Sequence, residues 1–369
     1  MTIKLLCVVG ARPNFMKVAP IYKTLKQNST AIEPVLVHTG QHYDKSMDAQ
    51  FFEQLNIPKP EINLEVGSGT HAIQTAKIMQ GFDGVLDDFD GSDARVLVVG
   101  DVNSTLACAL VTAKRGKPLV HVEAGMRSLD RGMPEEINRI LTDQLSDLLF
   151  TTERAAEANL TKENIPKEKI HFVGNVMIDT LREYQQYAVP SSETLEQNNL
   201  DAFGQYGLVT LHRPSNVDNP QVFNRVVSAL AEVSEKLPLV FPVHPRTRQR
   251  IESLDKGALD LSKIHLIPPV SYLEMLGLMR EASLVLTDSG GVQEETTALG
   301  VPCLTLRDNT ERPVTVSQGS NTIVGTQKEN IIKHAFTALE NREDGKKIPE
   351  LWDGQSANRI ADKLEQCWL

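Results

Sequence analysis

The sequence predicts an α/β fold with two doubly wound, Rossmann-like domains. Short apolar runs alternate with longer helical patterns from one end of the chain to the other. The runs lack a clean polar–apolar alternation, which is typical of strands buried on both faces of a parallel sheet. At about 150 residues per domain, 369 residues suit two domains or three. The alternating order implies parallel strands joined by right-handed crossovers.

The expected strands fall into two series. The first comprises Ile3–Val9, Pro34–His38, Val96–Gly100, Pro118–Val122, Asp147–Thr151 and Ile170–Val173, and the second Gly207–Leu211, Leu239–Val243, His265–Ile267, Leu284–Thr287 and Pro302–Thr305. Between them, apolar residues recur with a period near 3.6, which predicts helices. The expected helices include Asn14–Lys26, Thr105–Lys114, Glu135–Leu145, Glu153–Leu160, Val222–Leu237 and Val292–Leu299.

The boundary between the two domains is expected near the middle of the chain. The stretch Tyr184–Asn199 is polar and contains Pro190 and two serines, so it is the weakest segment for regular structure. We therefore place a linker at about residues 180–200. This gives a first domain over 1–180 and a second over 181–354. The pattern alone does not assign the last helix, Ala357–Trp368, to either domain.

Composition and charge narrow the classes of function. The chain has 38 Lys and Arg residues against 48 Asp and Glu, a formal net charge of −10. This excess of acid disfavours nucleic acid and anionic membranes as partners. No apolar stretch reaches the roughly 18 residues of a membrane span, and the N-terminus resembles a strand rather than a signal peptide. These features predict a cytoplasmic protein. The four cysteines lack CxxC spacing and the histidines lack HxH or HExxH spacing, so no metal site is expected.

Two glycine-containing turns are candidate phosphate sites. In VVGARPNFMKVAP, a strand runs into a turn with Arg12 and Lys17 at the start of a helix. Helix N-termini and Arg both suit phosphate, although a plain turn with solvated charges is the alternative. In VLTDSGGVQEETTALG, Ser289, Gly290 and Gly291 form the turn. Adjacent glycines let the backbone approach a phosphate closely.

Acidic residues follow this second turn. One helical turn further on, Glu294 or Glu295 could accept both hydroxyls of a ribose. The alternative for the whole segment is helix capping by Ser289, with acidic residues that complement the helix dipole.

Carboxylates gather at the ends of two other predicted strands. Asp101 follows a strand in VVGDVNST, where it could instead be a helix N-cap. Glu123 follows a strand in HVEAGMRS, and Glu135, Glu136 and Arg139 begin the next helix, with Glu135 and Arg139 on one face. Carboxylates crowded in one cleft would have separated pKa values and could act as acid and base. Solvated surface carboxylates are the alternative.

Histidines lie at similar positions. His38 and His42 lie in VHTGQHYD, His212 precedes Arg213 in VTLHRPSN, and His244 precedes Pro245 in PVHPRTR. Each group is at or just past a predicted strand end, where ligands bind in open parallel sheets. A structural role is the alternative for any one of them.

These motifs together resemble the UDP-N-acetylglucosamine 2-epimerase family, non-hydrolysing branch. The matching segments are GARPNFMKVAP, TGQHYD, GDVNST, HVEAGMRS, PEEINR, GNVMID, LHRPSN, PVHPR, TDSGGVQEE and TERPV, in family order. The resemblance implies a GT-B-like architecture, with two Rossmann-like domains and a cleft between them. It also implies that the second domain holds UDP and that the C-terminal helix, 355–369, packs back on the first domain.

The resemblance also implies roles for individual residues. Asp101, Glu123 and Glu135 look like the proton-transfer and sugar-orienting carboxylates, and His212 like the cleft histidine that meets the diphosphate or the reacting sugar. The implied substrate-binding residues are Arg12, Lys17, His42, Arg139, His244, Ser289, Gly290, Gly291, Glu295 and Arg312. Among these, Ser289–Gly291 resemble the diphosphate turn and Glu295 the ribose clamp. Which carboxylate is base and which is acid stays open.

The implied reaction is reversible inversion at C2 of UDP-N-acetylglucosamine, which gives UDP-N-acetylmannosamine. It proceeds by anti elimination of UDP to bound 2-acetamidoglucal, followed by re-addition, and needs no cofactor. The family also implies a homodimer and a product used for polysaccharide precursors.

Several alternatives remain at this stage. The substrate could be a related UDP-acetamido sugar, either a diacetamido sugar or a uronate. The protein could also be a GT-B glycosyltransferase that uses a UDP-sugar, a non-catalytic UDP-sugar sensor, or a hydrolysing epimerase.

Overall fold

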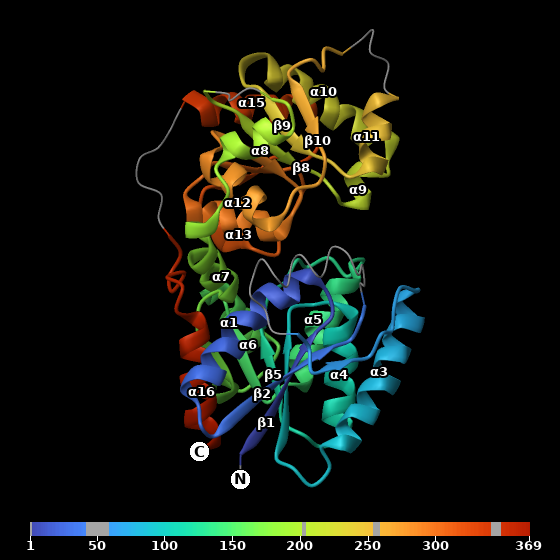
Figure 1. Cartoon of the computed structure of the whole chain (residues 1–369), viewed down its shortest axis with the longest axis vertical. Helices are drawn as coiled ribbons and strands as arrows, with labels where there is room; N and C mark the ends of the chain where they lie inside the picture. Colours follow the sequence, from blue (N-terminus) through green and yellow to red (C-terminus); the bar gives the residue numbers. More distant parts are fainter. Residues whose placement is uncertain (1, 42–58, 201–203, 254–258, 341–347) are drawn as a thin grey trace. The chain divides into compact units, whose positions relative to one another are not determined.

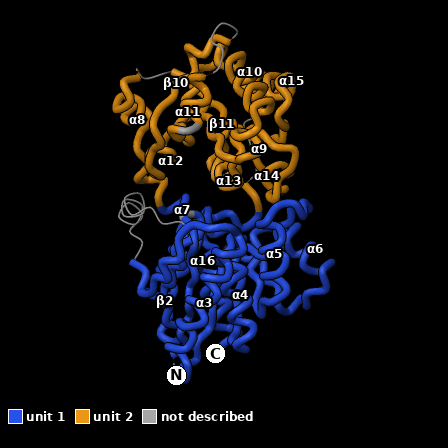
Figure 2. Tube along the Cα trace, turned by 90° about the vertical axis from the view of Figure 1, so that its right-hand side faces the viewer, with its two compact units in different colours: residues 1–183, 350–369 blue, residues 184–349 orange. Residues whose placement is uncertain are grey.

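The chain forms two compact units, which are described separately. The computed structural model describes residues 2–41, 59–200, 204–253, 259–340 and 348–369. Unit 1 contains residues 1–183 together with 350–369, and unit 2 contains residues 184–349 (Figure 2). The chain therefore passes from unit 1 into unit 2 after Glu183 and returns at Glu350.

Unit 1 is built on a seven-stranded parallel sheet with the order β3-β2-β1-β4-β5-β6-β7. The strands are β1 (Ile3–Val9), β2 (Ile32–His38), β3 (Ile62–Asn63), β4 (Ala94–Val99), β5 (Leu119–Val122), β6 (Leu148–Thr151) and β7 (Ile170–Phe172). In the register of the central strands, Leu6 of β1 lies between Val35 of β2 and Val96 of β4. The central strands are buried on both faces, which explains their continuous apolar sequences.

Helices cover both faces of this sheet (Figure 1). They are α1 (Arg12–Asn28), α3 (His71–Asp88), α4 (Asn103–Lys114), α5 (Pro134–Leu145), α6 (Arg154–Lys162), α7 (Val176–Tyr184) and α16 (Ser356–Trp368). Apolar side chains of α3 and α4, such as Phe82 and Val111, share one buried cluster with Leu6 and Val96 of the sheet. The helix pair α1 and α16 lies on the other side.

The last helix belongs to unit 1 through several tertiary contacts. In α7, the carboxylate of Asp179 accepts the backbone N–H groups of Ser356 (3.1 Å) and Ala357 (2.6 Å), so it caps the first turn of α16. The indole of Trp352 is buried and donates to the carbonyl of Thr152 (3.2 Å). Along the helix, Glu365 accepts from the hydroxyl of Ser29 at the end of α1 (2.6 Å). These contacts attach the C-terminal segment to the first sheet.

Unit 2 repeats the same topology with six parallel strands in the order β10-β9-β8-β11-β12-β13. The strands are β8 (Gly207–Thr210), β9 (Leu239–Pro242), β10 (Ile264–Ile267), β11 (Leu284–Thr287), β12 (Cys303–Thr305) and β13 (Asn321–Ile323). The helices are α8 (Ser191–Gln197), α9 (Pro214–Val217), α10 (Pro220–Lys236), α11 (Pro245–Glu252), α12 (Tyr272–Glu281), α13 (Gly290–Leu299), α14 (Pro313–Ser317) and α15 (Lys328–Glu340). Strands β1 to β6 of unit 1 and the six strands of unit 2 share the order 3-2-1-4-5-6 of dinucleotide-binding folds. The strand order reverses between β1 and β4 in unit 1 and between β8 and β11 in unit 2.

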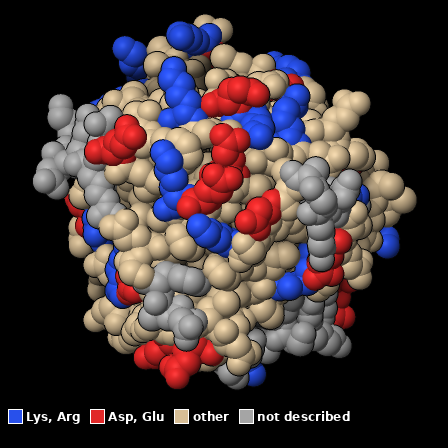
Figure 3. Space-filling view, turned by 90° about the horizontal axis from the view of Figure 1, so that it is seen from above, with Lys and Arg blue, Asp and Glu red and all other residues tan. Residues whose placement is uncertain are grey.

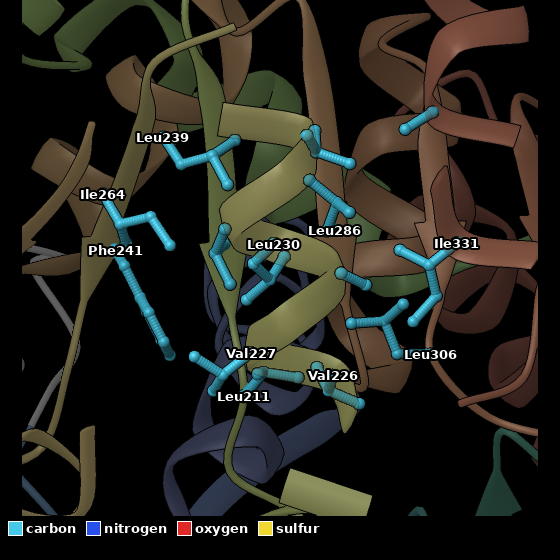
Figure 4. Packing of buried hydrophobic residues seen from close by; sticks show 14 of the residues in the cluster. Leu211, Val226, Val227, Leu230, Leu239, Phe241, Ile264, Leu286, Leu306 and Ile331 are labelled. Atoms are coloured by element: carbon cyan, nitrogen blue, oxygen red, sulfur yellow. The ribbon is translucent and has the colours of Figure 1, made fainter. Parts of the chain in front are cut away.

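The core of unit 2 shows why its helices lie where they do. Val226, Val227 and Leu230 recur at helical spacing on α10 and point toward Phe241 and Leu286 of the sheet (Figure 4). A second cluster on the opposite face joins residues of α8 and α12 to the same strands. Both faces of the sheet are therefore covered. On the surface in Figure 3, basic and acidic side chains are interspersed rather than separated.

The predicted fold class is confirmed, and most strand limits agree within one or two residues. Two predictions need correction. The segment expected to lack regular structure contains helix α8, because Leu195 is buried in the core of unit 2. The edge strand β13 and several helices, among them α3, α7, α12 and α15, were not among the expected elements.

Candidate functional site

The first group of polar side chains lies at the carboxyl edge of the unit 1 sheet. Glu123 directly follows β5, and Asp101 lies two residues beyond the end of β4. Helix α5 begins at Pro134 and brings Glu135, Glu136 and Arg139 into its first two turns. We call this set, together with Lys17 of α1, the unit 1 edge. Its position next to the reversal of strand order is the usual ligand site of such sheets.

Glu123 is held by a buried cation and a strained backbone. Its carboxylate forms an ion pair with the ammonium group of Lys17, and both residues are buried. Its φ angle is 71°, in the left-handed region that residues other than glycine rarely adopt. The N–H groups of Glu123 and Ala124 both donate to the carbonyl of Phe150 (3.0 Å each), which keeps this turn in place. Strain of this kind clusters at functional sites.

Asp101 is joined to helix α5 by Arg139. The guanidinium Nη2 lies 2.5 Å from Asp101 Oδ2, and Nη1 pairs with Glu136. The side chain of Asp101 keeps 27 % of its surface exposed, whereas that of Arg139 keeps 3 %. Arg139 therefore holds a carboxylate that solvent or substrate can still reach.

The structure separates the roles of Glu135 and Glu136. The expected pairing on one helix face joins Glu136, rather than Glu135, to Arg139. The carboxylate of Glu136 also accepts from the N–H groups of Ser128 (2.9 Å) and Leu129 (3.0 Å). Burial alone would raise the pKa of Glu136, but these hydrogen bonds and the charge of Arg139 hold it below its usual value. Glu135 is half-buried, and its side-chain carboxylate forms no hydrogen bond or ion pair with the part of the chain that the structure describes.

The remaining unit 1 predictions have mixed outcomes. Lys17 was expected to reach a phosphate, and the structure places its ammonium group on Glu123. Arg12 is the first residue of α1, but its side chain lies outside the described structure, as does all of His42. His38, at the end of β2, is buried and lies edge-on to the ring of Phe15 with centroids 5.1 Å apart.

The second group lies at the carboxyl edge of the unit 2 sheet and is centred on Asp288, one residue past β11. Asp288 is completely buried, and its carboxylate accepts the backbone N–H groups of His212 (3.1 Å) and Arg213 (3.0 Å). Its Oδ1 also lies 2.9 Å from Nδ1 of His212, whose side chain is 64 % exposed. Burial acts to raise the pKa of Asp288, but the hydrogen bond from His212 holds it below its usual value. The pair orients an accessible imidazole on a fixed carboxylate.

The diphosphate candidate Ser289–Gly291 lies at the start of helix α13. Ser289 is the N-cap residue but makes no side-chain capping bond, so capping by its hydroxyl does not occur. A Cβ at Gly290 would lie 2.7 Å from Nη1 of Arg312 and 2.8 Å from Oε1 of Glu311. The buried Arg312–Glu311 pair packs against the turn, so a side chain at residue 290 would have to displace the ends of these two side chains. The first N–H groups of α13 and the guanidinium of Arg312 together suit an anion.

Arg312 is fixed by two carboxylates. Its Nε lies 2.8 Å from Oε1 of Glu294, and its Nη1 lies 2.6 Å from Oε1 of Glu311. Although Glu311 is buried, which would raise its pKa, the charges of Arg312 and Arg307 lower that pKa well below the usual range. Glu294, one of two ribose candidates, therefore forms an ion pair with Arg312.

Glu295 is the other ribose candidate and has a different environment. It is buried and accepts a hydrogen bond from the hydroxyl of Tyr272 (3.0 Å). Burial, together with the charge of Glu294, raises the pKa of Glu295 to about 7 despite the hydrogen bond from Tyr272. His244 lies just past β9, where its carbonyl accepts the N–H groups of Thr247 (2.9 Å) and Arg248 (3.0 Å) at the start of α11. Its imidazole is exposed.

Sequence reasoning missed Asp288 and Glu311 as site residues. Both lie inside the motifs TDSGGVQEE and TERPV, next to the predicted site residues Ser289 and Arg312. The available signal was an acidic residue that directly follows a buried strand or directly precedes an Arg. The described residues contain no group of three or more His, Cys, Asp or Glu arranged to hold a metal ion. None of the described helices is both long and apolar enough to span a membrane.

Known proteins resemble this chain over nearly its whole length. A sequence model of the family described as UDP-N-acetylglucosamine 2-epimerase matches residues 23–365. A relative with that name from Methanocaldococcus jannaschii is 43% identical over 362 residues, which cover 97% of each chain. A Pseudomonas aeruginosa relative named UDP-2,3-diacetamido-2,3-dideoxy-D-glucuronate 2-epimerase is 42% identical over 367 residues, 98% of this chain and 99% of that one.

A solved structure agrees with these matches. The Methanocaldococcus jannaschii UDP-GlcNAc 2-epimerase, in complex with UDP-GlcNAc and UDP, matches with a TM-score of 0.86 and 41% identity. The match covers 98% of this chain and 99% of that chain. Because the family model, the relatives and the fold agree over nearly the whole length, the chain belongs to the UDP-N-acetylglucosamine 2-epimerase family.

Proposed function

We propose that the protein interconverts UDP-N-acetylglucosamine and UDP-N-acetylmannosamine by inversion at C2. The observation that carries this proposal is the pair of carboxylates at neighbouring strand ends of unit 1. Asp101 and Glu123 are each held by a cation, Arg139 and Lys17, and each lies just past the end of a strand. Paired and positioned carboxylates are what proton removal and return at one carbon require.

The difficulty of the reaction explains why a leaving group is needed. The C2 proton of the sugar is not acidified by a carbonyl, so simple deprotonation would be slow. In the proposed route, a carboxylate takes the C2 proton and the C–H electrons form a C1–C2 double bond. The C1–O bond breaks, and UDP leaves with its electron pair. UDP then adds back to C1 after a proton reaches the opposite face of C2.

Each edge supplies different groups to this route. Asp101, Glu123 and Glu135 of unit 1 transfer protons and orient the sugar. In unit 2, the N–H groups at Ser289–Gly291 and the guanidinium of Arg312 bind the departing diphosphate, and His212 meets it or the reacting sugar. Positive groups on the leaving diphosphate stabilise the charge that develops as the C1–O bond breaks. Glu295 accepts the ribose hydroxyls.

A second substrate has specific support. The relative named for a diacetamido-glucuronate sugar is 42% identical, close to the 43% of the relative named for UDP-N-acetylglucosamine. Overall identity therefore does not separate the two substrates. Both share the UDP group and an acetamido group at C2, so the same elimination applies to both.

A homodimer remains a prediction.

The test is incubation with UDP-N-acetylglucosamine in heavy water, without added cofactor, followed at C2 by NMR. We expect deuterium at C2 and the appearance of UDP-N-acetylmannosamine. Free N-acetylmannosamine with UDP would instead indicate a hydrolysing enzyme. Exchange only with the diacetamido uronate would identify the second substrate. UDP binding without exchange on either sugar would reject the epimerase.

A further inference from the structure

A fully buried histidine lies beneath the unit 1 edge. His121 is in β5, two residues before Glu123, and its side chain is completely buried. Its Nδ1 lies 2.7 Å from Oδ1 of Asp143 in α5, and its Nε2 lies 2.9 Å from the carbonyl oxygen of Gly100. Both partners of the ring are hydrogen-bond acceptors. With the Asp143 carboxyl ionised, both contacts are hydrogen bonds only if both ring nitrogens donate, and only the doubly protonated imidazolium carries two N–H groups.

The surroundings supply the charge that this form needs. Asp143 is completely buried, and its other oxygen, Oδ2, lies 2.7 Å from Nη2 of Arg127 and accepts the N–H of Gly125 (3.1 Å). The positive charge of Arg127 stabilises the ionised form of this carboxyl. Arg127 in turn pairs with Glu163 through Nη2 (2.5 Å) and Nε (2.8 Å). Two cations and two anions balance within the network, as buried charges require.

This network holds the two turns that carry the proposed catalytic carboxylates. The Gly100 carbonyl belongs to the peptide bond that links Gly100 to Asp101. The Gly125 N–H lies two residues after Glu123, in a turn where Gly125 has a φ of 80°. A Cβ at Gly125 would lie 2.6 Å from the carbonyl oxygen of Ala156, so the turn is closely packed from outside as well. The His121–Asp143 pair therefore contacts both turns: His121 contacts the Gly100 carbonyl, and Asp143 accepts the Gly125 N–H.

We propose that His121 is a positioning residue that acts as a buried imidazolium and, with Asp143, fixes Asp101 and Glu123 for proton transfer. It does not touch the substrate. It sets the geometry of two carboxylates on adjacent strand ends through one backbone carbonyl and one backbone N–H. The kinetic part of this inference rests on the proposed epimerase function, whereas the protonation state does not.

The protonation state is tested first, without any assay of activity. The wild-type protein is labelled with ¹⁵N at its histidines, and the ring nitrogens are observed by NMR at neutral pH. We expect both nitrogens of His121 to resonate in the protonated range, with the signals assigned by their loss in His121→Gln or their shift in Asp143→Asn. A ring nitrogen in the unprotonated range would overturn the imidazolium and with it the proposal.

The kinetic test uses two substitutions that keep different halves of the network. In His121→Asn, the amide nitrogen takes the place of Nδ1 and keeps the hydrogen bond to Asp143. In His121→Gln, the longer side chain puts its amide nitrogen in the place of Nε2 and keeps the hydrogen bond to Gly100. We expect His121→Asn to lose on the order of 10²-fold in kcat for C2 exchange, since small misplacements of catalytic groups have effects of that size. His121→Gln should recover part of this loss. The Kd for UDP should not change, because the proposed UDP-binding groups belong to unit 2.

The matched control is His171→Gln, a histidine of β7 in the same sheet that bonds to neither turn. We expect it to keep the wild-type kcat. Equal kcat values for His121→Asn and the wild type would overturn the positioning role. If His121→Asn does not fold, the comparison of His121→Gln with Asp143→Asn decides, and equal kcat for those two and the wild type would reject the proposal. Absence of C2 exchange in the wild type would instead reject the proposed function and leave the NMR result standing.

Discussion

The two carboxyl edges of this protein share one topology but carry opposite kinds of chemistry. At the unit 1 edge, carboxylates are held by buried cations: the accessible Asp101 by Arg139, and the buried Glu123 by Lys17. At the unit 2 edge, an imidazole is presented and the carboxylate of Asp288 is buried behind it. The first arrangement suits proton transfer and the second suits an anion. The strand order places a site at each edge, and the side chains at the strand ends decide what that site does.

The two edges also differ in backbone strain. Glu123 of unit 1 has a positive φ, a conformation that costs on the order of 1–3 kcal/mol for a residue other than glycine. In unit 2, the close approach at residue 290 is made by a glycine, so the side chains of Arg312 and Glu311 lie against the turn where a Cβ would otherwise be. The strained residue is therefore at the edge where one carboxylate must be aimed. The four predictions below test this division of roles.

The largest effect is expected at the unit 1 carboxylates. Asp101→Asn and Glu123→Gln should each lower kcat for C2 exchange by about 10²–10⁴-fold, the usual contribution of a positioned acid or base. UDP affinity should change little, because the proposed diphosphate groups belong to unit 2. Steady-state kinetics and UDP titration by calorimetry measure both quantities.

The control for Asp101 lies at the other end of the same strand. Asp93 directly precedes β4 and pairs with Arg95 at 2.9 Å. Asp93→Asn removes a similar ion pair and should leave kcat unchanged. Wild-type exchange in Asp101→Asn would show that proton transfer does not depend on this carboxylate.

The next effect is expected at His212. His212→Asn should lower kcat by about 10²-fold, because the ring is held on Asp288 and remains accessible to substrate. Asp288→Asn should lower kcat and weaken UDP binding, since Asp288 accepts the backbone N–H groups of His212 and Arg213 and so holds the turn that carries His212. His334→Asn, which changes a half-buried histidine of α15, is the control. If His212→Asn weakens UDP binding but keeps kcat, the histidine binds the diphosphate without a role in catalysis.

A pH-dependent effect is expected at Glu295. Its folded-state pKa of about 7 lies above the reference value of 4.5, so the native state binds more protons than the unfolded state between these values. Stability should therefore fall as pH rises through this window, by about 3 kcal/mol in total for this group. Glu295→Gln should remove that component and be more stable than the wild type at about pH 8.

Binding of UDP gives an independent measure of the same group. A ribose donates its hydroxyls to the ionised carboxylate, so the Kd for UDP should decrease as pH rises from about 6 to about 8. The Kd of Glu295→Gln should not follow this trend. Glu196→Gln, at an exposed position of α8, serves as the control for both measurements. An identical pH profile for Glu295→Gln and the wild type would exclude Glu295 as the ribose acceptor.

The smallest effect is expected from a comparison of adjacent glycines. Gly290→Ala introduces a Cβ at 2.7 Å from Arg312 and should destabilise unit 2 by about 1–3 kcal/mol. Gly291→Ala meets no atom within 4 Å and should stabilise the first turn of α13 by up to about 1 kcal/mol. Thermal unfolding of both variants provides the measurement. Equal melting temperatures would mean that the Arg312–Glu311 pair moves aside without cost.

Part of the fold was predictable because its signals are local. The strands Ile3–Val9 and Leu284–Thr287 agree with the expected limits, since long apolar runs between turns have few other interpretations. Helix α8 was not predicted, because its polar sequence is stabilised by Leu195 in the core and not by its own pattern. The place of α16 on unit 1 likewise depends on long-range contacts such as that of Asp179 with Ala357.

The positions of the site residues were predictable from the sequence, but the residues with which each one pairs were less so. The strand ends identified Asp101, Glu123 and His212, and the structure places each of them at a carboxyl edge. The pairing of residues within an edge did not follow from spacing. Arg139 bonds to Glu136 and Asp101, and not to Glu135, because the neighbouring turns at Ser128 and Leu129 draw Glu136 inward.

The sequence by itself determined that this chain has two doubly wound parallel sheets and that its reactive residues follow their strands. Those features depend on apolar patterning and on turn residues close together in the chain. Only the tertiary structure decided which charges are neutralised, which carboxylate stays accessible and which histidine is buried between two acceptors. Such properties arise from residues far apart in sequence, as when His121, Asp143 and Gly100 meet at one point, and the proposed charge of the ring depends on the acceptors on its two sides.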